Sequence, residues 1–409
     1  MARTHPREAM VRRDVVVTGV GAVTPLGVGA RELHEGWCAG RSGIRDGQAA
    51  CSEFEPGGYL SIRELRRTDR FTQLAIVATD EALSQAGWPG DPPYDPGRVG
   101  CVLGTGIGGL ATIERAKETL MRSGPGRVSP LSIPLMMSNA APAAVAMRHN
   151  LRGPAYSVTS ACAAGAHAIG AAFRAIQCGD ADAIVTGGSE AALTALARAG
   201  FTALNALSST GVSRPFDARR DGFVLGEGAG ALVLEEAESA ARRGARALAR
   251  LRGFGASSDA GDIVAPDMSG RSQADAIVRA LADAAVEPEQ VVYVNAHGTS
   301  TPLNDRAETM ALKQALGAHA QRVAVSSTKS AIGHLLGAAG PVETVATILA
   351  LRDGIAPPTL GWEEPEEGLD LDYVPLAARP LDIDGAPAIG ISSSFGFGGQ
   401  NAVLCVEAL

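Results

Sequence analysis

The chain has 409 residues, of which 46% are hydrophobic and 4% aromatic, and its formal net charge is −8. This length supplies a large core and allows two or three domains. The acidic balance excludes general nucleic-acid binding, because a phosphate-binding surface needs a basic domain. Apolar stretches are too short to span a membrane, so we expect a cytoplasmic protein. The six cysteines lack the paired spacing of a disulfide framework or a zinc cluster, so no metal is expected.

The N-terminal part begins with a predicted flexible leader, residues 1–13. A Val-rich strand follows from Asp14 and runs into a glycine turn before a helix over 30–40. Gly19 and Gly21 suggest a dinucleotide-binding loop, but no complete G-x-G-x-x-G follows. A tight turn is therefore the better interpretation.

A basic cluster precedes the amphipathic helix predicted over residues 71–88. Arg63, Arg66 and Arg67 share roughly one helical face on an otherwise acidic chain. A solvated helix face would explain them, and so would a docking surface for an acidic partner.

Strands and helices then alternate through the chain. A buried strand from Val99 breaks into a glycine loop that holds Ile107, and a helix or interface segment covers 132–147. After further strands and a helix start at Glu235, a second half begins near residue 248 and repeats the alternation. This pattern predicts an α/β protein with a mostly parallel sheet.

The stretch 155–178 is the one around which the chain is organised. Its β-branched run, 156–159, predicts a short strand, and the Ala/Gly-rich run after it predicts a buried helix. Cys162 lies at the turn between them, where the helix N-terminus favours the thiolate. A buried, inert cysteine is the competing interpretation, and it suits Cys101, Cys178 and Cys405.

A weak internal duplication relates the two halves. Residues 323–340 repeat the strand, polar turn and small-residue helix of the Cys162 region, which puts Cys162 and Ser330 in corresponding turns. Two similar halves packed face to face would bring both turns near one centre.

Four loops carry the candidate chemistry: the Cys162 turn and residues 295–305, 327–340 and 392–401. Each follows a predicted strand, at the edge where ligands bind in open α/β sheets. A thiol together with the loop histidines His297 and His334 indicates nucleophilic acyl chemistry.

The ordered motifs VTSACAAGAHAIG, AHGTSTPLND, STKSAIGHLLGAAG and FGFGGQN resemble those of the β-ketoacyl-acyl carrier protein synthases of the elongating type II class. The resemblance runs from about Val15 to the C-terminus. It implies a thiolase-like fold of two duplicated α/β halves, 14–247 and 248–409, in five αβαβα layers. It also implies a homodimer that catalyses decarboxylative Claisen condensation without a cofactor, on substrates carried by the phosphopantetheine of an acyl carrier protein.

The resemblance also implies roles for the residues of the motifs. Cys162 would accept the acyl chain, and the backbone N–H groups of Cys162 and Phe397 would form the oxyanion hole. His297 and His334 would hydrogen-bond the malonyl thioester carbonyl as the enolate develops.

Further residues of these motifs would support that chemistry. Lys329 and Glu308 would form an ion pair that orients the histidines, and Thr299 and Thr301 would hold the pantetheine amides.

Phe397 would also act as a gate, hinged on the glycines beside it. Ile107, with Phe201 and Phe395, would line the acyl pocket, where an Ile leaves room for longer chains than a Phe. Arg63, Arg66 and Arg67 would dock the acidic carrier.

The chain departs from the family pattern at Ala163, Ala164 and Gln400. The sequence is compatible with two kinds of pathway: fatty-acid synthesis, or a type II polyketide or polyene pathway. In the second kind the synthase forms a heterodimer with a chain-length-setting partner. Cys162 argues against a non-catalytic partner subunit. A thiolase would need a second catalytic cysteine, for which Cys405 is poorly placed, and a cysteine hydrolase would have no use for pantetheine-binding threonines.

Overall fold

The chain folds around one mixed β-sheet with strands from both halves of the sequence. The computed structural model describes residues 12–88, 90–383, 385 and 387–409. The sheet contains 11 strands in the order β4-β3-β5-β6-β1-β7-β13-β12-β8-β9, with β2 paired to β1. Its strands are β1 Val15–Thr24, β2 Gly27–Val28, β3 Val99–Gly104, β4 Ala155–Val158, β5 Ala183–Glu190, β6 Gly228–Glu236, β7 Ala249–Ser258, β8 Val291–Asn295, β9 Ala324–Ser326, β12 Ile389–Gly396 and β13 Gln400–Ala408. A separate pair joins β10 Ile355–Ala356 to β11 Arg379–Pro380.

The two halves of the sheet repeat one strand order. Outward from the centre, the first half runs β1, β6, β5, β3, β4 and the second runs β7, β13, β12, β8, β9. Each half thus begins with its central strand, and β1 meets β7 in antiparallel pairing over Val15–Val17. This shared order confirms the duplicated α/β halves that the sequence predicts.

The expectation of a mostly parallel sheet is wrong. Parallel pairing joins β3 to β4 and β5, and β8 to β9 and β12. The central strands pair antiparallel, as β5 with β6 and β12 with β13. Only residues 397–399 connect β12 to β13, which is too short for the crossover that parallel strands need. Residues 392–396 therefore belong to β12 and residues 400–401 to β13, so the predicted loop shrinks to residues 397–399.

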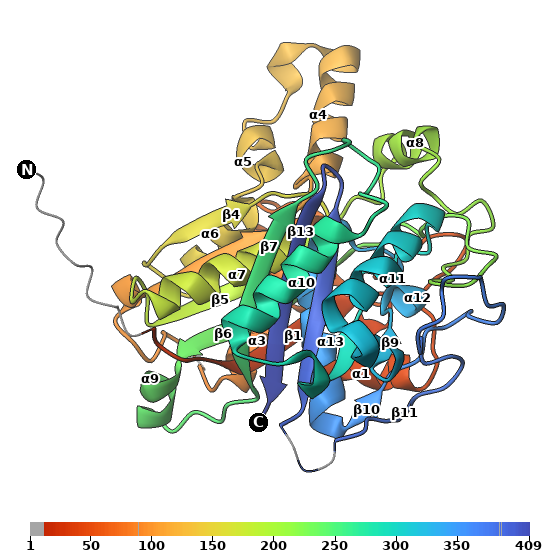
Figure 1. Ribbon diagram of the computed structural model, residues 1–409. Helices are drawn as coiled ribbons and strands as arrows, with labels where there is room; N and C mark the ends of the chain where they lie inside the picture. The colour runs from red at the N-terminus through yellow and green to blue at the C-terminus, as the bar shows by residue number, and fades with distance from the viewer. Residues whose placement is uncertain (1–11, 89, 384, 386) are drawn as a thin grey trace, which may run out of the picture.

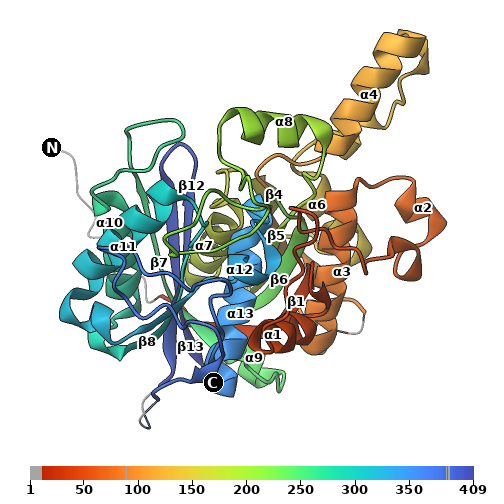
Figure 2. The same cartoon turned by 90° about the vertical axis from the view of Figure 1, so that its right-hand side faces the viewer.

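Helices cover both faces of the sheet and fill the space between its halves (Figures 1 and 2). The helices are α1 Ala30–Cys38, α2 Ile62–Leu65, α3 Arg70–Gln85, α4 Leu110–Ser123, α5 Ser132–Met136, α6 Ala140–Arg148, α7 Ala164–Gln177, α8 Ala195–Ala203, α9 Ala237–Arg242, α10 Arg271–Ala284, α11 Pro302–Leu316, α12 Lys329–Ile332 and α13 Ala339–Asp353. α3 packs on β1 and β6, and α10 packs on β7 and β13. α7 and α13 touch each other and strands of both halves, so they form the middle layer of a five-layer αβαβα fold.

The middle layer explains why its helices are apolar and small. Every residue of α13 from Ala339 to Leu351 is buried, as expected for a helix without a polar face. In α7, a Cβ on Gly165 would lie 2.3 Å from Cδ of Pro341, and one on Gly170 would lie 2.5 Å from the Phe254 ring. Only glycine permits this approach of the two helices and of β7.

The duplication is inexact where it matters for chemistry. Ser330 follows the end of β9 by four residues, as Cys162 follows the end of β4. Ser330 nevertheless lies on the short helix α12, and its hydroxyl donates to the Ser327 carbonyl at 2.7 Å. The second half thus has a residue at the position that corresponds to Cys162, but the side chain of that residue bonds the local backbone.

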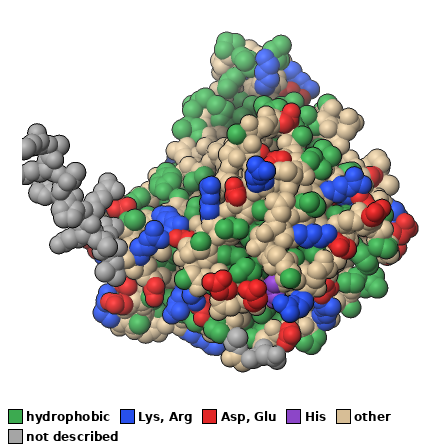
Figure 3. Space-filling view, in the orientation of Figure 1, with side chains coloured by type: hydrophobic (Ala, Val, Ile, Leu, Met, Phe, Trp, Pro, Cys, Tyr) green, Lys and Arg blue, Asp and Glu red, His purple; other side chains and the backbone are tan. Residues whose placement is uncertain are grey.

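An arm formed by α4 and α5 stands out from the body in both views (Figures 1 and 2). Figure 3 shows hydrophobic side chains over this arm, and the exposed ones include Leu120, Met121 and Ile133. β4, at one end of the sheet, exposes Tyr156 to 42%. Apolar surface of this kind marks a candidate interface with another chain.

The N-terminal leader lies mostly outside the described residues, because residues 1–11 are not described. Arg12 and Arg13 are described, and they pair with Asp283 at 2.8 Å and Asp182 at 3.0 Å. The predicted boundary at 247/248 falls in the connection between α9 and β7. The division into leader and two halves at these residues stays a prediction.

Candidate active site

Cys162 lies in a strained turn between β4 and α7. Ala161, directly before it, has φ +50°, a left-handed conformation that residues other than glycine adopt at an energetic cost and often at functional sites. Ser160 bonds His167 Nδ1 at 2.8 Å across this turn. The backbone N–H of Phe397 lowers the pKa of the Cys162 thiol against the larger effect of burial, and a Cβ on the neighbouring Gly396 would lie 3.2 Å from Cys162 N. The turn and the 396–399 loop therefore meet at Cys162.

The Cys162 thiol is not biased toward the thiolate as the sequence predicts. Burial raises the pKa of Cys162 to about 12, although the Lys329 charge and the Phe397 N–H lower it. α7 begins only at Ala164, so Cys162 precedes the first turn of the helix. The effect of burial on the pKa of the thiol is therefore larger than the effect of the helix N-terminus. In the resting site Cys162 is thus a thiol.

Two buried histidines face each other beside this cysteine. The rings of His297, after β8, and His334, after α12, lie edge to face with centroids 5.3 Å apart. His334 Nδ1 accepts the Leu336 N–H at 3.2 Å, so its proton lies on Nε2, which is then a donor. Burial and the Lys329 charge hold the pKa of both rings well below the usual range. Both are therefore neutral at physiological pH.

The predicted Lys329–Glu308 ion pair is wrong. Lys329 pairs instead with Glu343 on α13, and both side chains are buried. Glu308, on α11, accepts the backbone N–H groups of His297 and Gly298, both at 2.7 Å. Burial raises the pKa of Glu308 to about 7. Glu308 thus holds the His297 loop through its backbone, and Lys329 acts on the site through its charge.

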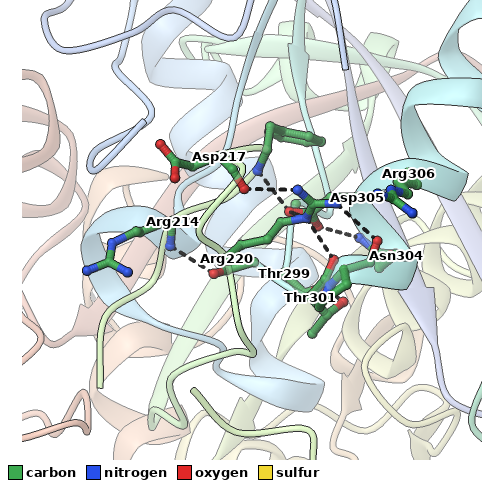
Figure 4. Close-up of polar contacts among 12 residues, drawn as sticks. Arg214, Asp217, Arg220, Thr299, Thr301, Asn304, Asp305 and Arg306 are labelled. Carbon is green, nitrogen blue, oxygen red and sulfur yellow. Dashed lines mark hydrogen bonds and ion pairs between the residues drawn. The ribbon is translucent and has the colours of Figure 1, made fainter. Parts of the chain in front are cut away.

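The loop with the two threonines is braced from behind (Figure 4). Thr299 Oγ1 and Thr301 Oγ1 bond each other at 2.8 Å. The buried Arg220 guanidinium donates to the Thr301 carbonyl at 3.3 Å and lies 3.6 Å from Asp305. Asp305 in turn accepts the Phe216 N–H at 2.8 Å. The two hydroxyls are thereby fixed at the rim of the site.

The 396–399 loop is tied to a second loop over residues 259–266. Gly398 N–H donates to the Ile263 carbonyl at 2.9 Å. Because this bond is between backbone atoms, it does not depend on the side chains of either loop. A second tie lies just beyond the first loop, where Asn401 Nδ2 donates to Asp259 Oδ1 at 2.7 Å. The two loops therefore close one side of the site together.

Phe397 lies within the first of these loops. Its side chain is half-buried, and its ring centroid lies 6.4 Å from that of Phe201. The ring thus stands beside the apolar wall of the site, and the gating role of Phe397 stays a prediction.

A cavity of about 370 Å³ joins these groups. Its residues from the first half are mainly apolar, and those from the second half include the histidines and most of the polar groups. The lining includes Cys162, Phe201, Leu204, Ala206, Phe223, Asp259, Gln273, His297, Thr299, Thr301, Asn304, His334, Leu336, Phe395, Phe397 and Asn401. The structure thus brings together Cys162, both histidines, both threonines, Phe201, Phe395 and Phe397.

Ile107 is not part of this lining. It is 38% exposed in the loop between β3 and α4, while Leu110, three residues further on, belongs to the small apolar cluster around Cys162. The predicted role of Ile107 at the end of the acyl pocket stays a prediction.

Sequence reasoning missed two buried carboxylates that organise the site. Glu190, at the end of β5, accepts the N–H groups of Gly106 at 2.6 Å and Gly337 at 3.1 Å. It thereby joins the Ile107 loop to the chain that follows His334. Glu343 is the partner of Lys329. A buried acid at a strand end was a usable signal for Glu190, whereas nothing local marks Glu343.

The predicted docking residues lie at the surface. Arg63, on α2, and Arg66 and Arg67, just after it, are exposed. No carboxylate of the described residues lies within 4.0 Å of their guanidinium groups, whereas the neighbouring Glu64 is paired with Arg148. Their charge is thus available to a partner.

Two further observations bear on the class of protein. In the part of the chain that the structure describes, His, Cys, Asp and Glu form no group of three that could hold a metal ion. Within the same residues, no helix is both long and apolar enough to cross a membrane.

Comparison with solved structures defines the class. A beta-ketoacyl synthase from Burkholderia phymatum STM815 superposes with a TM-score of 0.90 at 35% identity, covering 97% of this chain and 100% of that one. The ishigamide ketosynthase/chain length factor gives 0.89 at 34% identity, with the same coverage. The fold and the site together define a thiolase-like acyltransferase.

Comparison of sequences then gives the family. Residues 47–240 match the model of the beta-ketoacyl synthase N-terminal domain, and residues 248–363 match that of the C-terminal domain. The 3-oxoacyl-[acyl-carrier-protein] synthase 2 of Synechocystis sp. is 44% identical over 97% of this chain and 98% of its own length. The chain belongs to the beta-ketoacyl synthase family.

Proposed function

We propose that this enzyme is a 3-oxoacyl-[acyl-carrier-protein] synthase that extends a fatty-acyl chain by two carbons. The observation that carries the proposal is one cavity lined by a buried thiol and two neutral histidines. The family and the name of the Synechocystis relative support the same activity.

The first step is transfer of an acyl group to Cys162. The sulfur attacks the thioester carbonyl of the acyl carrier, a Cys162 S–C bond forms, and the bond from carbonyl carbon to pantetheine sulfur breaks. The thiol proton leaves with the pantetheine sulfur. The N–H of Phe397 lowers the pKa of the Cys162 thiol against the larger effect of burial, and together with the Cys162 N–H it would stabilise the oxyanion of the tetrahedral intermediate.

The second step needs the histidines. Malonyl carrier loses carbon dioxide, and negative charge develops on its thioester oxygen. Neutral rings are suited to this because they donate a hydrogen bond without titrating, and His334 holds its donor on Nε2. The resulting carbanion attacks the acyl carbonyl carbon, so a C–C bond forms and the bond from that carbon to the Cys162 sulfur breaks. The 3-oxoacyl product stays on the carrier, and the released Cys162 thiolate takes up a proton from solvent.

Exposed charged and apolar side chains indicate which proteins this enzyme would bind. An acyl carrier protein would dock at Arg63, Arg66 and Arg67, because an acidic carrier complements exposed and unpaired arginines. A second copy of the chain would pair along β4 and cover the apolar arm. Native mass spectrometry tests whether the protein is a dimer. A monomer at micromolar concentration would contradict the proposed homodimer.

A ketosynthase subunit of a type II polyketide or polyene synthase is the second candidate. It is favoured by the full-length match to the ishigamide ketosynthase/chain length factor. Co-expression with a chain-length partner would then yield a heterodimer in place of the homodimer.

One experiment tests the main proposal. Purified protein is incubated with acyl carrier and malonyl carrier, and Cys162 peptides and products are analysed by mass spectrometry. We expect acyl-Cys162 and a 3-oxoacyl product longer by two carbons. Acylation without any condensed product contradicts the proposal. The acyl group found on Cys162 in protein from its native cells then separates the two pathways.

A further inference from the structure

Gln273 is a buried glutamine in the wall of the active-site cavity. It lies in the first turn of α10, its exposed fraction is 1%, and it shares the lining with Phe395 and Asn401. Neither the catalytic assignment nor the predicted substrate contacts use it.

The amide of Gln273 is unsatisfied by the protein. Among the described residues, neither Oε1 nor Nε2 has a hydrogen-bond partner. Nearby polar groups already have other hydrogen-bond partners. Asn401 Nδ2 donates to Asp259 and to Ser257, and the Ser257 hydroxyl donates to the Ser272 carbonyl. A buried amide without partners is costly, so native proteins rarely keep one. Because Gln273 lines the cavity, a ligand there is the available source of partners for this amide.

The two walls of the cavity indicate which part of a substrate reaches this amide. Phe201, Phe223 and Leu336 surround the Cys162 side with apolar surface, which suits an acyl chain. Gln273 lies outside this apolar cluster, in the part of the lining that the second half supplies together with Thr299 and Asn304, which we call the polar wall. That wall suits the polar arm that carries the thioester.

We propose that Gln273 binds a secondary amide in the arm of the thioester substrate and thereby selects for that arm. Both the donor and the acceptor of Gln273 lack partners among the described residues, and a secondary amide offers both complementary groups. This inference rests on the proposed function, because it assumes a thioester carried on a pantetheine-like arm.

The test replaces Gln273 by methionine, which keeps the length of the side chain and removes its amide. Condensation is measured with malonyl thioesters of pantetheine, of N-acetylcysteamine, which keeps only the amide nearest the sulfur, and of a simple alkyl thiol, which has none. We expect Gln273→Met to raise KM about 3- to 10-fold for a thioester that carries the recognised amide. The alkyl thioester should be used equally well by both proteins.

Gln314→Met is the matched control. Gln314 is exposed on α11 and donates to the Ser269 carbonyl at 2.6 Å, so this variant should keep the KM of the wild type for every thioester. If Gln273→Met does not fold, Gln273→Ala removes the same amide without added bulk and is compared in the same way.

An unchanged KM for all three thioesters in the Gln273 variants overturns the proposal. So does an equal rise of KM for all three thioesters, the alkyl thioester included, because Gln273 would then act without any amide in the arm. The wild-type protein keeps these outcomes separate from the proposed function. If it condenses malonyl and acyl carriers, the function stands whatever Gln273 does.

Discussion

The two halves of the molecule share one topology and divide the chemistry between them. The first half supplies Cys162 and the apolar wall, and the second supplies both histidines, both threonines and the polar wall. At the positions that correspond, the first half has a cysteine in a strained turn and the second has Ser330 on α12, followed by His334. A duplicated fold thus brings two loops to one centre, after which each can specialise in bond formation or in charge stabilisation.

The largest expected effect concerns the buried ion pair behind this centre. Lys329→Met leaves Glu343 as an uncompensated buried charge, so we expect the free energy of unfolding to fall by about 3–5 kcal/mol. Lys329→Met combined with Glu343→Gln removes both charges and should recover most of this loss. Urea unfolding measures both variants.

The same double variant shows whether Lys329 also acts on the nucleophile. The Lys329 charge lowers the pKa of the Cys162 thiol against the effect of burial, so its removal should shift the pH profile of Cys162 alkylation to higher pH. An unchanged alkylation profile would limit Lys329 to a structural role.

The neutral histidines of the second half should make stability depend on acid pH. An unfolded histidine has a pKa of about 6.5, whereas burial holds His297 and His334 well below their usual pKa. Below about pH 6.5 the unfolded state therefore binds more protons, and the free energy of unfolding falls by up to roughly 1.4 kcal/mol per pH unit for each ring.

Unfolding of the wild type and of a His297→Gln, His334→Gln variant between about pH 7.5 and 5.5 measures this effect. Glu308, with its pKa raised to about 7, contributes with the opposite sign but is present in both proteins. Parallel pH dependences in the two proteins would mean that the rings protonate freely in the fold.

Substitution of Glu190 tests whether the hydrogen bonds of this carboxylate hold loops of both halves in place. Glu190→Gln turns one acceptor into an NH₂ group among the N–H groups of Gly106, Ile107 and Gly337. We expect about 2 kcal/mol lower stability, with slower acylation and slower decarboxylation, because both loops lose their common anchor. Loss of acylation alone would show that Glu190 serves only the first half.

The smallest effect is expected at the surface of the first half. Charge reversal of Arg63, Arg66 and Arg67 should raise KM for carrier-bound substrate about tenfold and weaken the salt dependence of the remaining activity. Reversal of Arg246, Arg279 and Arg322, which are exposed and lie away from the protruding arm, provides a control with the same change in charge. Equal losses in both variants would place carrier docking elsewhere.

Local signals in the sequence predict most of the elements and three of the residues that line the cavity. Cys162, His297 and His334 each follow a strand in a distinctive loop, and the apolar, small-residue pattern of α7 and α13 marks buried helices. Antiparallel pairing at the centre of the sheet was not predictable, because the sequence of a strand does not determine which strand it pairs with. The Glu343 partner of Lys329 and the open amide of Gln273 were missed for the same reason, since each depends on contacts made only in three dimensions.

The central claim is that Cys162 forms the covalent bond while the histidines stabilise the enolate. Release of labelled carbon dioxide and formation of acyl-enzyme are measured separately in Cys162→Gln, His297→Ala and His334→Ala. Cys162→Gln should lose acylation and condensation but keep or increase decarboxylation, because its amide occupies the position of the acyl thioester. Each histidine variant should still be acylated in part, while decarboxylation slows by about 10²- to 10³-fold. A Cys162→Gln protein that cannot decarboxylate malonyl carrier, or histidine variants that decarboxylate normally, would contradict this division of labour.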